Sequence, residues 1–258
     1  MSYTLKHGST IGTAKVISND LLPKGRAIPA RKLNSIGSVT LHMTGNTDVK
    51  ANNYHRALKN QNALPDGRQA SWTYVVDDVE IYQEVPDNWE TWHSGTSTGN
   101  KNSIGIEMCM WSNKERQRKT YDNSARLVAM LLKKYNLKPS DIKQHYDWSK
   151  KDCPLFLRHK KYNYDWTWFK NLVKKYYNET ASGSTQNTNS MYVVNADVLN
   201  VRDGRGSEFK KVGTLTKGQK IEIWSVAKSS DNADWGSFRY STNPDIIGFV
   251  HMGYLKKV

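Results

Sequence analysis

Three residues of the chain, His42, His145 and Cys153, are of the types that hold a catalytic zinc ion. Such an ion takes three protein ligands, typically imidazole nitrogens with a thiolate or carboxylate, and keeps one position open for water. Two neutral imidazoles and one thiolate give a site of net charge +1, which still lowers the pKa of its water. This set predicts metal-assisted hydrolysis. The alternative is a structural histidine pair and a buried thiol.

Glu107 is the candidate general base for that water. In the run around it, period-two alternation puts Ile106 and Met108 on one face and Glu107 and Cys109 on the other. A carboxylate in an apolar strand costs free energy unless it is paired or used. The alternative interpretation is that Glu107 lies on the exposed face of an edge strand and has no catalytic role. Cys109 shares the face of Glu107, so by pattern alone it rivals Cys153 as the thiolate ligand.

A cation beside the Cys153 loop completes the set. Lys150 and Lys151 precede Cys153, and an ammonium there would stabilise the oxyanion that forms when water attacks an amide carbonyl. The simpler interpretation is solvation of a lysine-rich loop.

The elements that must position these residues belong to a mixed α/β domain. Alternation or strand-favouring composition predicts strands over 38–44, 72–77 and 104–111. Helical periodicity appears in three places, which predicts helices packed on a sheet. The stripes are Val49, Tyr54, Ala57 and Leu58; Ala125, Val128, Leu131, Leu132 and Tyr135; and Phe169, Leu172, Val173 and Tyr176.

A second, smaller domain follows a polar segment. Residues 179–190 are small and polar with one charge, which is typical of a flexible linker between a domain over 1–178 and one over 191–258. The last part carries short β-type runs separated by turn signals and no helical stripe. We therefore expect a small all-β barrel or sandwich there.

Composition and charge narrow the classes of function. The chain has 258 residues and a net charge of +14, and residues 1–178 hold 28 of the 38 basic and 16 of the 24 acidic side chains. Such a field favours polyanionic partners, but the basic residues are scattered and no nucleic-acid motif is visible. No apolar run could span a membrane, and the first residues do not resemble a secretory signal. We expect synthesis in the cytoplasm and two cysteines without a structural disulfide.

Four segments, LHMTGN, WHSG, NKNSIGIE and HYDWSKKDCP, resemble in order and separation the type-2 N-acetylmuramoyl-L-alanine amidases. The resemblance covers roughly residues 15–175. It implies an α/β catalytic domain with a mixed central sheet flanked by helices. It also implies one zinc ion on His42, His145 and Cys153, which decides against Cys109, with Glu107 as catalytic carboxylate and Lys151 as transition-state cation.

The resemblance further implies substrate contacts at His93, Asn46 and Trp72. Trp72 stands where some relatives carry a catalytic tyrosine, so this chain is similar to the branch that relies on the carboxylate, and Tyr74 receives no role. Some relatives carry histidine where Thr73 stands, so that imidazole is missing here. His55 is expected on the surface or in packing.

The implied reaction is hydrolysis of the amide between the lactyl group of N-acetylmuramic acid and L-alanine of peptidoglycan. Zinc-activated water attacks, Glu107 acts as base and then returns the proton to the nitrogen, and Lys151 helps to hold the oxyanion. The alternative is a non-cutting peptidoglycan-recognition protein of the same fold. Inactive relatives of that kind typically lack the cysteine.

Residues 191–258 resemble bacterial SH3-like wall-binding modules, carried by VLNVRDGRGS, VGTLTKG and GFV. The implied partners are the peptidoglycan of a Gram-positive cell wall and anionic wall polymers, with no nucleic acid. An aromatic platform of Trp224, Trp235, Phe238 and Tyr240 is considered, with at least two of the four expected in the core. A phage or prophage lysis enzyme, released through a holin or by lysis, fits the missing signal.

Overall fold

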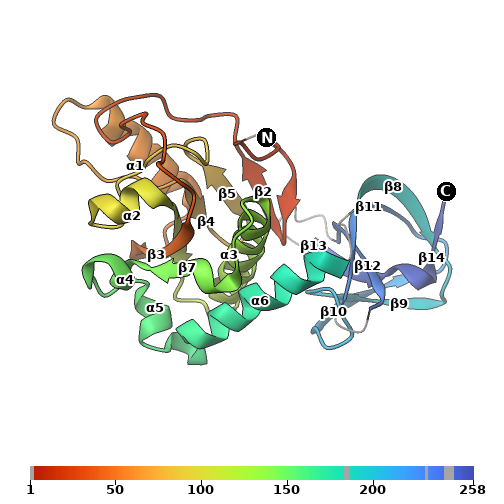
Figure 1. Ribbon diagram of the computed structural model, residues 1–258. Helices are drawn as coiled ribbons and strands as arrows, with labels where there is room; N and C mark the ends of the chain where they lie inside the picture. Colours follow the sequence, from red (N-terminus) through yellow and green to blue (C-terminus); the bar gives the residue numbers. More distant parts are fainter. Residues whose placement is uncertain (1–2, 183–185, 230–231, 241–246) are drawn as a thin grey trace. The chain divides into compact units, whose positions relative to one another are not determined.

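The chain divides into two compact units, Met1–Tyr177 and Asn178–Val258, in a computed structural model (Figure 1). The structure describes residues 3–182, 186–229, 232–240 and 247–258, and it describes side chains outside 179–189. The predicted linker, 179–190, lies beside this division. Helix α6 reaches Ser182 and strand β8 begins at Gln186, and residues 183–185 lie outside the described residues, so the predicted domain limits stay predictions.

The first unit is built on a seven-stranded mixed sheet. The strand order is β1-β2-β5-β4-β6-β3-β7. Strands β4, β6, β3 and β7 run parallel to one another, whereas β4 pairs with β5 in antiparallel fashion. The strands are β1 (Thr10–Ile11), β2 (Ala14–Ile17), β3 (Ser38–Thr47), β4 (Tyr74–Val76), β5 (Glu80–Gln83), β6 (Ser103–Met110) and β7 (Ile142–Gln144).

Helices cover both faces of this sheet (Figure 1). The core face of β3, β4 and β6 packs against α3 and α6, and the opposite face meets α1. Asn113 begins α3 because its side chain accepts hydrogen bonds from the backbone N–H groups of Glu115 and Arg116. The helices are α1 (Ala51–Ala63), α2 (Ser97–Asn102), α3 (Lys114–Lys134), α4 (His145–Ser149), α5 (Leu155–Arg158) and α6 (Trp166–Ser182), with short 3-10 turns at Pro139–Asp141, Lys161–Asn163 and Met252–Tyr254.

The predicted α/β organisation of this unit is confirmed, with differences in detail. All three predicted strands and all three predicted helices are present. Ala57, assigned to the buried stripe of α1, is exposed, because α1 buries Ala51, His55, Leu58 and Asn62 instead. The helix turns a polar face with two hydrogen-bonding side chains toward the protein, which an apolar-stripe pattern does not detect.

The second unit is an all-antiparallel sheet with strand order β10-β9-β13-β12-β11-β8-β14. Its core includes Val201, Ile223, Phe238 and Val250, so the all-β prediction is confirmed. The strands are β8 (Gln186–Val194), β9 (Val198–Arg202), β10 (Lys211–Thr216), β11 (Lys220–Lys228), β12 (Asp234–Arg239), β13 (Ile247–His251) and β14 (Leu255–Lys257).

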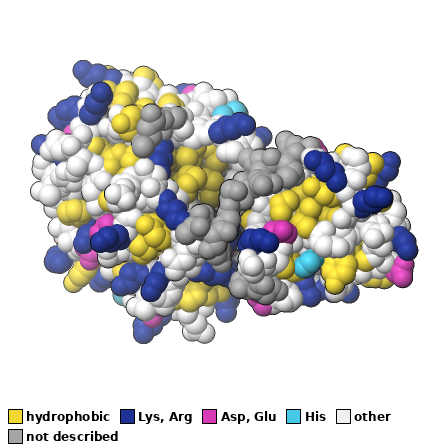
Figure 2. Space-filling view, turned by 45° about the vertical axis from the view of Figure 1, so that its right-hand side comes forward, with side chains coloured by type: hydrophobic (Ala, Val, Ile, Leu, Met, Phe, Trp, Pro, Cys, Tyr) yellow, Lys and Arg dark blue, Asp and Glu magenta, His cyan; other side chains and the backbone are white. Residues whose placement is uncertain are grey.

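The surface is rich in basic side chains. Figure 2 shows lysine and arginine side chains spread over the face in view, interleaved with polar and hydrophobic ones, with few acidic groups between them. Among the described residues, none of the helices combines the length and apolar character that crossing a bilayer requires.

Candidate metal centre

Strand β3 positions His42 by alternation. Val39, Leu41 and Met43 point into the core shared with α3, so the side chains between them point to the opposite face. His42 lies on that opposite face and is only 1% exposed. A buried imidazole at this position needs polar partners, because an unpaired polar group in the interior is costly.

The adjacent parallel strand β7 leads directly to the second histidine. His145 is the first residue of α4, and the carboxylate of Asp147 accepts a hydrogen bond of 2.8 Å from the backbone N–H of Gln144. This capping interaction fixes the start of the helix. The loop then returns so that the backbone N–H of Tyr146 donates to the carbonyl of Cys153 at 3.1 Å, which brings the thiol back beside His145.

His42, His145 and Cys153 form one cluster of possible metal ligands. Their ligand atoms all lie within 4.8 Å of one another. His42 Nδ1 lies 2.9 Å from His145 Nδ1 and 3.9 Å from Cys153 Sγ. The thiol also accepts a hydrogen bond of 3.4 Å from the backbone N–H of Met43. The structure therefore brings together the three residues that the resemblance selected.

Burial sets the protonation of these groups. It lowers the pKa of His145 to about 4 and that of His42 well below its usual value, so both imidazoles are neutral and can donate lone pairs. Burial also raises the pKa of the Cys153 thiol to about 12. A thiol of this kind ionises when a metal cation binds it.

Glu107 lies on β6 directly beside His42 in the β3–β6 register. Its side chain is partly buried, and Oε2 is buried without a hydrogen-bond partner among the described residues. Burial raises the pKa of Glu107 to about 7, against the opposing effect of the positive charges of Lys151 and Arg68. An unpaired carboxyl group with a pKa near neutrality suits proton transfer.

Lys151 is exposed and lies two residues before Cys153. Its positive charge contributes a decrease to the pKa of His42, His145, Glu107 and Cys153. For Glu107 and Cys153 this decrease opposes the larger increase caused by burial. The ammonium therefore acts electrostatically on the whole cluster.

The three predicted substrate contacts occupy different environments. His93 is 7% exposed and its Nδ1 lies 2.9 Å from His42 Nε2, so it contacts a candidate ligand. Burial lowers the pKa of His93 to about 3. Asn46 is exposed at the end of β3. Trp72 is partly buried, with its ring edge-on to that of Tyr54 at 6.5 Å.

Tyr54 was missed by the sequence interpretation. Its hydroxyl accepts a hydrogen bond of 3.1 Å from the backbone N–H of Asn46 and lies 3.2 Å from the Asn46 carbonyl. It thereby joins α1 to the end of β3 that carries a predicted substrate contact. Its place on a helical stripe gave no signal for this contact.

Two groups without an assigned catalytic role lie away from the cluster. Tyr74 is fully buried and its hydroxyl donates to Asp87. Cys109 is fully buried among apolar side chains that include Val75 and Trp111, and the ligand group found in the described part of the chain does not include it.

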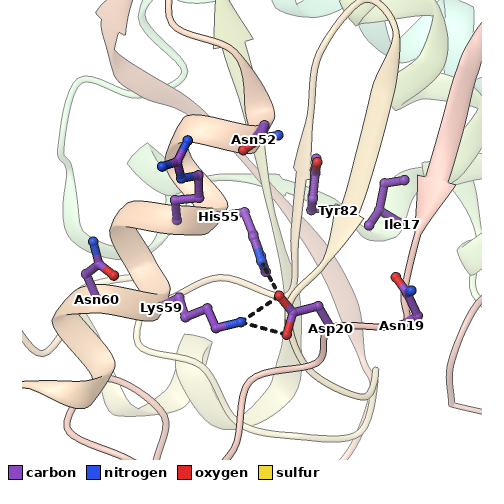
Figure 3. A pocket seen from close by; sticks show the side chains of 9 residues that line it. Ile17, Asn19, Asp20, Asn52, His55, Lys59, Asn60 and Tyr82 are labelled. Carbon is purple, nitrogen blue, oxygen red and sulfur yellow. Dashed lines mark hydrogen bonds and ion pairs between the residues drawn. The ribbon is translucent and has the colours of Figure 1, made fainter.

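His55 was expected either on the surface or in packing, and the structure places it in packing. It is 5% exposed, stacks on Tyr82, and bonds Glu84 at 2.7 Å and Asp20 at 3.1 Å. Figure 3 shows it on α1 beside Asp20, which Lys59 also contacts, at a pocket of about 590 Å³. This histidine joins α1 to β5.

The candidate ligands lie in the part of the chain that matches a known protein family. A family model described as N-acetylmuramoyl-L-alanine amidase matches residues 32–155. This range contains the candidate ligands, Glu107 and Lys151.

Two curated relatives are amidases of Bacillus subtilis (strain 168). The chain is 38% identical over 120 residues to the N-acetylmuramoyl-L-alanine amidase XlyA, which covers 45% of this chain and 38% of that protein. It is 34% identical over 143 residues to the N-acetylmuramoyl-L-alanine amidase CwlH, which covers 54% of this chain and 52% of that protein. The chain thus spans about half or less of the length of these relatives.

A solved structure described as a mutant endolysin from Bacillus subtilis is also similar. The sequence identity is 31%, the TM-score is 0.53, and the match covers 62% of this chain and 99% of that one. The likeness therefore extends over nearly the whole of the related chain.

Proposed function

The chain belongs to the N-acetylmuramoyl-L-alanine amidase family, and from this premise we propose that it hydrolyses peptidoglycan. The bond cut is the amide between the lactyl group of N-acetylmuramic acid and L-alanine of the stem peptide. The observation that carries the proposal is the cluster of His42, His145 and Cys153, in which His42 lies opposite Glu107 in the β3–β6 register, together with the Oε2 atom of Glu107, which is buried without a hydrogen-bond partner among the described residues.

The donor set of this cluster fits zinc. Two neutral imidazoles and one thiol, all buried, match the nitrogen and sulfur ligands that zinc prefers, and three protein ligands leave a position for water. Zinc bound there supplies Lewis acidity toward a water molecule and the substrate carbonyl.

The residues around the cluster carry out proton transfer, oxyanion stabilisation and substrate binding. Glu107 takes the proton of the attacking water as general base and delivers it to the departing L-alanine nitrogen as general acid. Its pKa of about 7 suits both directions of transfer. The ammonium of Lys151 stabilises negative charge that develops on the carbonyl oxygen, and Asn46 and Trp72 contact the substrate.

For the second unit we propose an SH3-like module that binds the Gram-positive cell wall. A pocket of about 350 Å³ on this unit is lined in part by Trp235, His251 and Tyr254, and Tyr254 is 53% exposed. Of the considered platform, Phe238 lies in the core and Trp235 is 4% exposed at this pocket. Attachment to an insoluble polymer raises the local concentration of the enzymatic unit.

The basic surface supports anionic wall polymers as additional partners. We also propose that the protein serves in cell lysis, as a phage or prophage lysis enzyme, which accords with the endolysin among its structural relatives.

The test is to incubate the purified protein with Gram-positive cell walls, with and without a chelator. We expect new L-alanine amino termini without new reducing sugar ends, abolished by the chelator and restored by zinc. New reducing ends would identify a glycosidase instead. Sedimentation with the walls without any cleavage would support the non-cutting recognition protein.

A further inference from the structure

The segment Trp92–Gly95 lies beside the Nε2 atoms of both candidate histidine ligands, His42 and His145. His93 Nδ1 lies 2.9 Å from His42 Nε2, and Gly95 lies close to His145 Nε2. We propose that His93 is a positioning group that fixes the ring orientation and tautomer of His42 for the metal. This inference rests on the proposed zinc site.

The hydrogen bonds of Ser103 determine which way the His93 ring donates. The Ser103 hydroxyl donates to the Gly99 carbonyl at 2.7 Å, so the same hydroxyl offers only lone pairs to His93. His93 Nε2 lies 3.3 Å from that hydroxyl oxygen and 3.4 Å from the Ser103 carbonyl oxygen. Both are acceptors here, so the proton of His93 is on Nε2.

The tautomer of His93 then determines that of His42. A neutral imidazole carries one N–H group, so His93 Nδ1 is an acceptor. His42 Nε2, 2.9 Å away, must donate to it. The lone pair of His42 is therefore on Nδ1, the atom that faces His145 and Cys153.

The second ligand lies beside the same segment. A Cβ added at Gly95 would lie 3.5 Å from His145 Nε2, in van der Waals contact with the ring. The Nδ1 atom of His145 faces His42. Each imidazole therefore has one nitrogen against the segment 92–95 and the other in the ligand cluster.

Asn100 of α2 holds the segment in place. Its Oδ1 accepts hydrogen bonds from the backbone N–H groups of His93 at 3.1 Å and Ser94 at 2.9 Å, and from the Ser94 hydroxyl at 2.9 Å. The backbone N–H of Trp92 donates to the Ser71 hydroxyl at 3.0 Å. These contacts hold the backbone that carries His93 in place.

Metal-ligating histidines commonly donate their second N–H to such a partner, and removal of the partner lowers metal affinity about 10- to 100-fold. The test compares His93→Phe with His93→Asn in the full-length protein. Phenylalanine keeps the bulk of the ring and removes the acceptor. Asparagine keeps an acceptor one bond from Cγ, where Nδ1 of His93 lies.

Zinc dissociation constants, measured by competition with a chromophoric chelator, are the first readout. We expect about 10- to 100-fold weaker zinc binding in His93→Phe and recovery of most of that loss in His93→Asn. His7→Phe, the same change at an exposed histidine, should leave affinity unchanged. Equal affinity in His93→Phe and the wild type would overturn the inference, whereas a wild type that binds no zinc would overturn the proposed metal site itself.

Nitrogen-15 NMR of the zinc-loaded wild type provides a readout that requires no variant. We expect protons on Nε2 of both His42 and His93, with the metal on Nδ1 of His42. A proton on Nδ1 of His42, with the metal on Nε2, would contradict the inference even if the phenylalanine variant failed to fold.

Discussion

At the scale of single residues, the two cysteines differ in what surrounds them. Cys153 has His42, His145 and a backbone N–H around its sulfur, whereas Cys109 lies among apolar side chains. Both thiols are buried, so burial alone does not distinguish a ligand from packing. The neighbouring nitrogen atoms make the distinction.

We therefore predict that Cys153→Ser loses tightly bound zinc and amidase activity together. A serine hydroxyl is a much poorer zinc ligand than a thiolate. Cys109→Ser should keep both, with at most a loss of stability. Zinc content by atomic emission and release of L-alanine amino termini are the measurements. Loss of zinc in Cys109→Ser alone would contradict the ligand assignment.

Glu107 carries a second prediction. Glu107→Gln should keep zinc but lower turnover about 10²- to 10⁴-fold, because the amide cannot accept the proton of the attacking water. Glu115→Gln, at an exposed position of α3, is the matched control and should leave turnover unchanged. Full activity in Glu107→Gln would remove Glu107 from its role as base.

The pH profile follows from the same carboxyl group. Burial raises the pKa of Glu107 to about 7 in the metal-free protein. A base works only when ionised, so activity should fall as the pH drops through that pKa. A bound dication would act in the opposite direction and lower the pKa of Glu107, which puts the midpoint of the acid limb of kcat/KM at or below about pH 7. A midpoint above pH 8 would contradict this assignment.

At the scale of elements, strand β6 contributes side chains both to the hydrophobic core and to the candidate site. Ile106 and Met108 pack into the core under α3, while Gly105 and Glu107 face the candidate site. Position 105 requires glycine because the ring of His93 occupies the space that a side chain would fill. A Cβ there would lie 2.7 Å from His93 Cγ, closer than such atoms approach.

Gly105→Ala should therefore displace the His93 ring and weaken zinc binding although every ligand and His93 itself remain. We expect a loss of about tenfold in zinc affinity, the lower end of the range for a displaced ligand partner. Gly45→Ala is the control, because a Cβ at position 45 meets nothing within 4 Å. Unchanged affinity in Gly105→Ala would show that the ring adapts.

The hydrogen bonds of His55 on α1 to Glu84, the residue after β5, and to Asp20 make a pH-dependent contribution to stability. The hydrogen bond to Glu84 raises the pKa of His55 above 6.5, against the opposing effect of burial, with Asp20 adding to the increase. Because the folded-state pKa is raised, this stabilisation is fully present below the unfolded value and is lost as the pH rises through the folded value.

His55→Gln should thus destabilise the first unit by about 2 kcal/mol near pH 6, the size of a hydrogen bond to a charged group. The difference from the wild type should shrink toward pH 9. Urea unfolding of both proteins at the two pH values measures this. A difference that grows with pH would contradict the protonated state of His55.

Patterns in the sequence predicted those elements whose apolar residues repeat with a clear period. β3 and β6 alternate, and α3 and α6 carry long stripes, so their existence and their core faces could be predicted. The two-residue strand β1 and the five-residue helix α4 are too short to show a period. They form because neighbouring strands and a capping carboxylate hold them.

The candidate site was predictable in its residue types but not in its contacts. His42, Glu107 and Cys153 followed from chemistry and the family resemblance. The contact of His93 with His42 did not, because it depends on a glycine in β6 and an amide on α2 that only the fold brings together. Supporting hydrogen bonds of this kind have no sequence signature of their own.

At the scale of the whole molecule, the chain combines two units that differ in secondary structure and in proposed task. The first holds the metal-ligand cluster and the second has a pocket with an exposed tyrosine. Each unit has its own hydrophobic core. Separate cores allow the two tasks to be separated by truncation.

A chain ending at Ser182, which keeps the whole of α6, should cleave small soluble muropeptides at the wild-type rate and sediment less with cell walls. The reason is that substrate chemistry needs only the first unit, while attachment raises the local concentration of the enzyme on an insoluble polymer. Tyr254→Ala in the full chain is the matched point variant, and it should reduce sedimentation without changing the cleavage of soluble substrate. Rates on soluble muropeptides and bound fractions on purified walls are measured side by side, with circular dichroism to check that the truncated chain is folded. Loss of soluble-substrate cleavage in a folded truncated chain would mean that the second unit contributes to the reaction itself, and the division of tasks would be wrong.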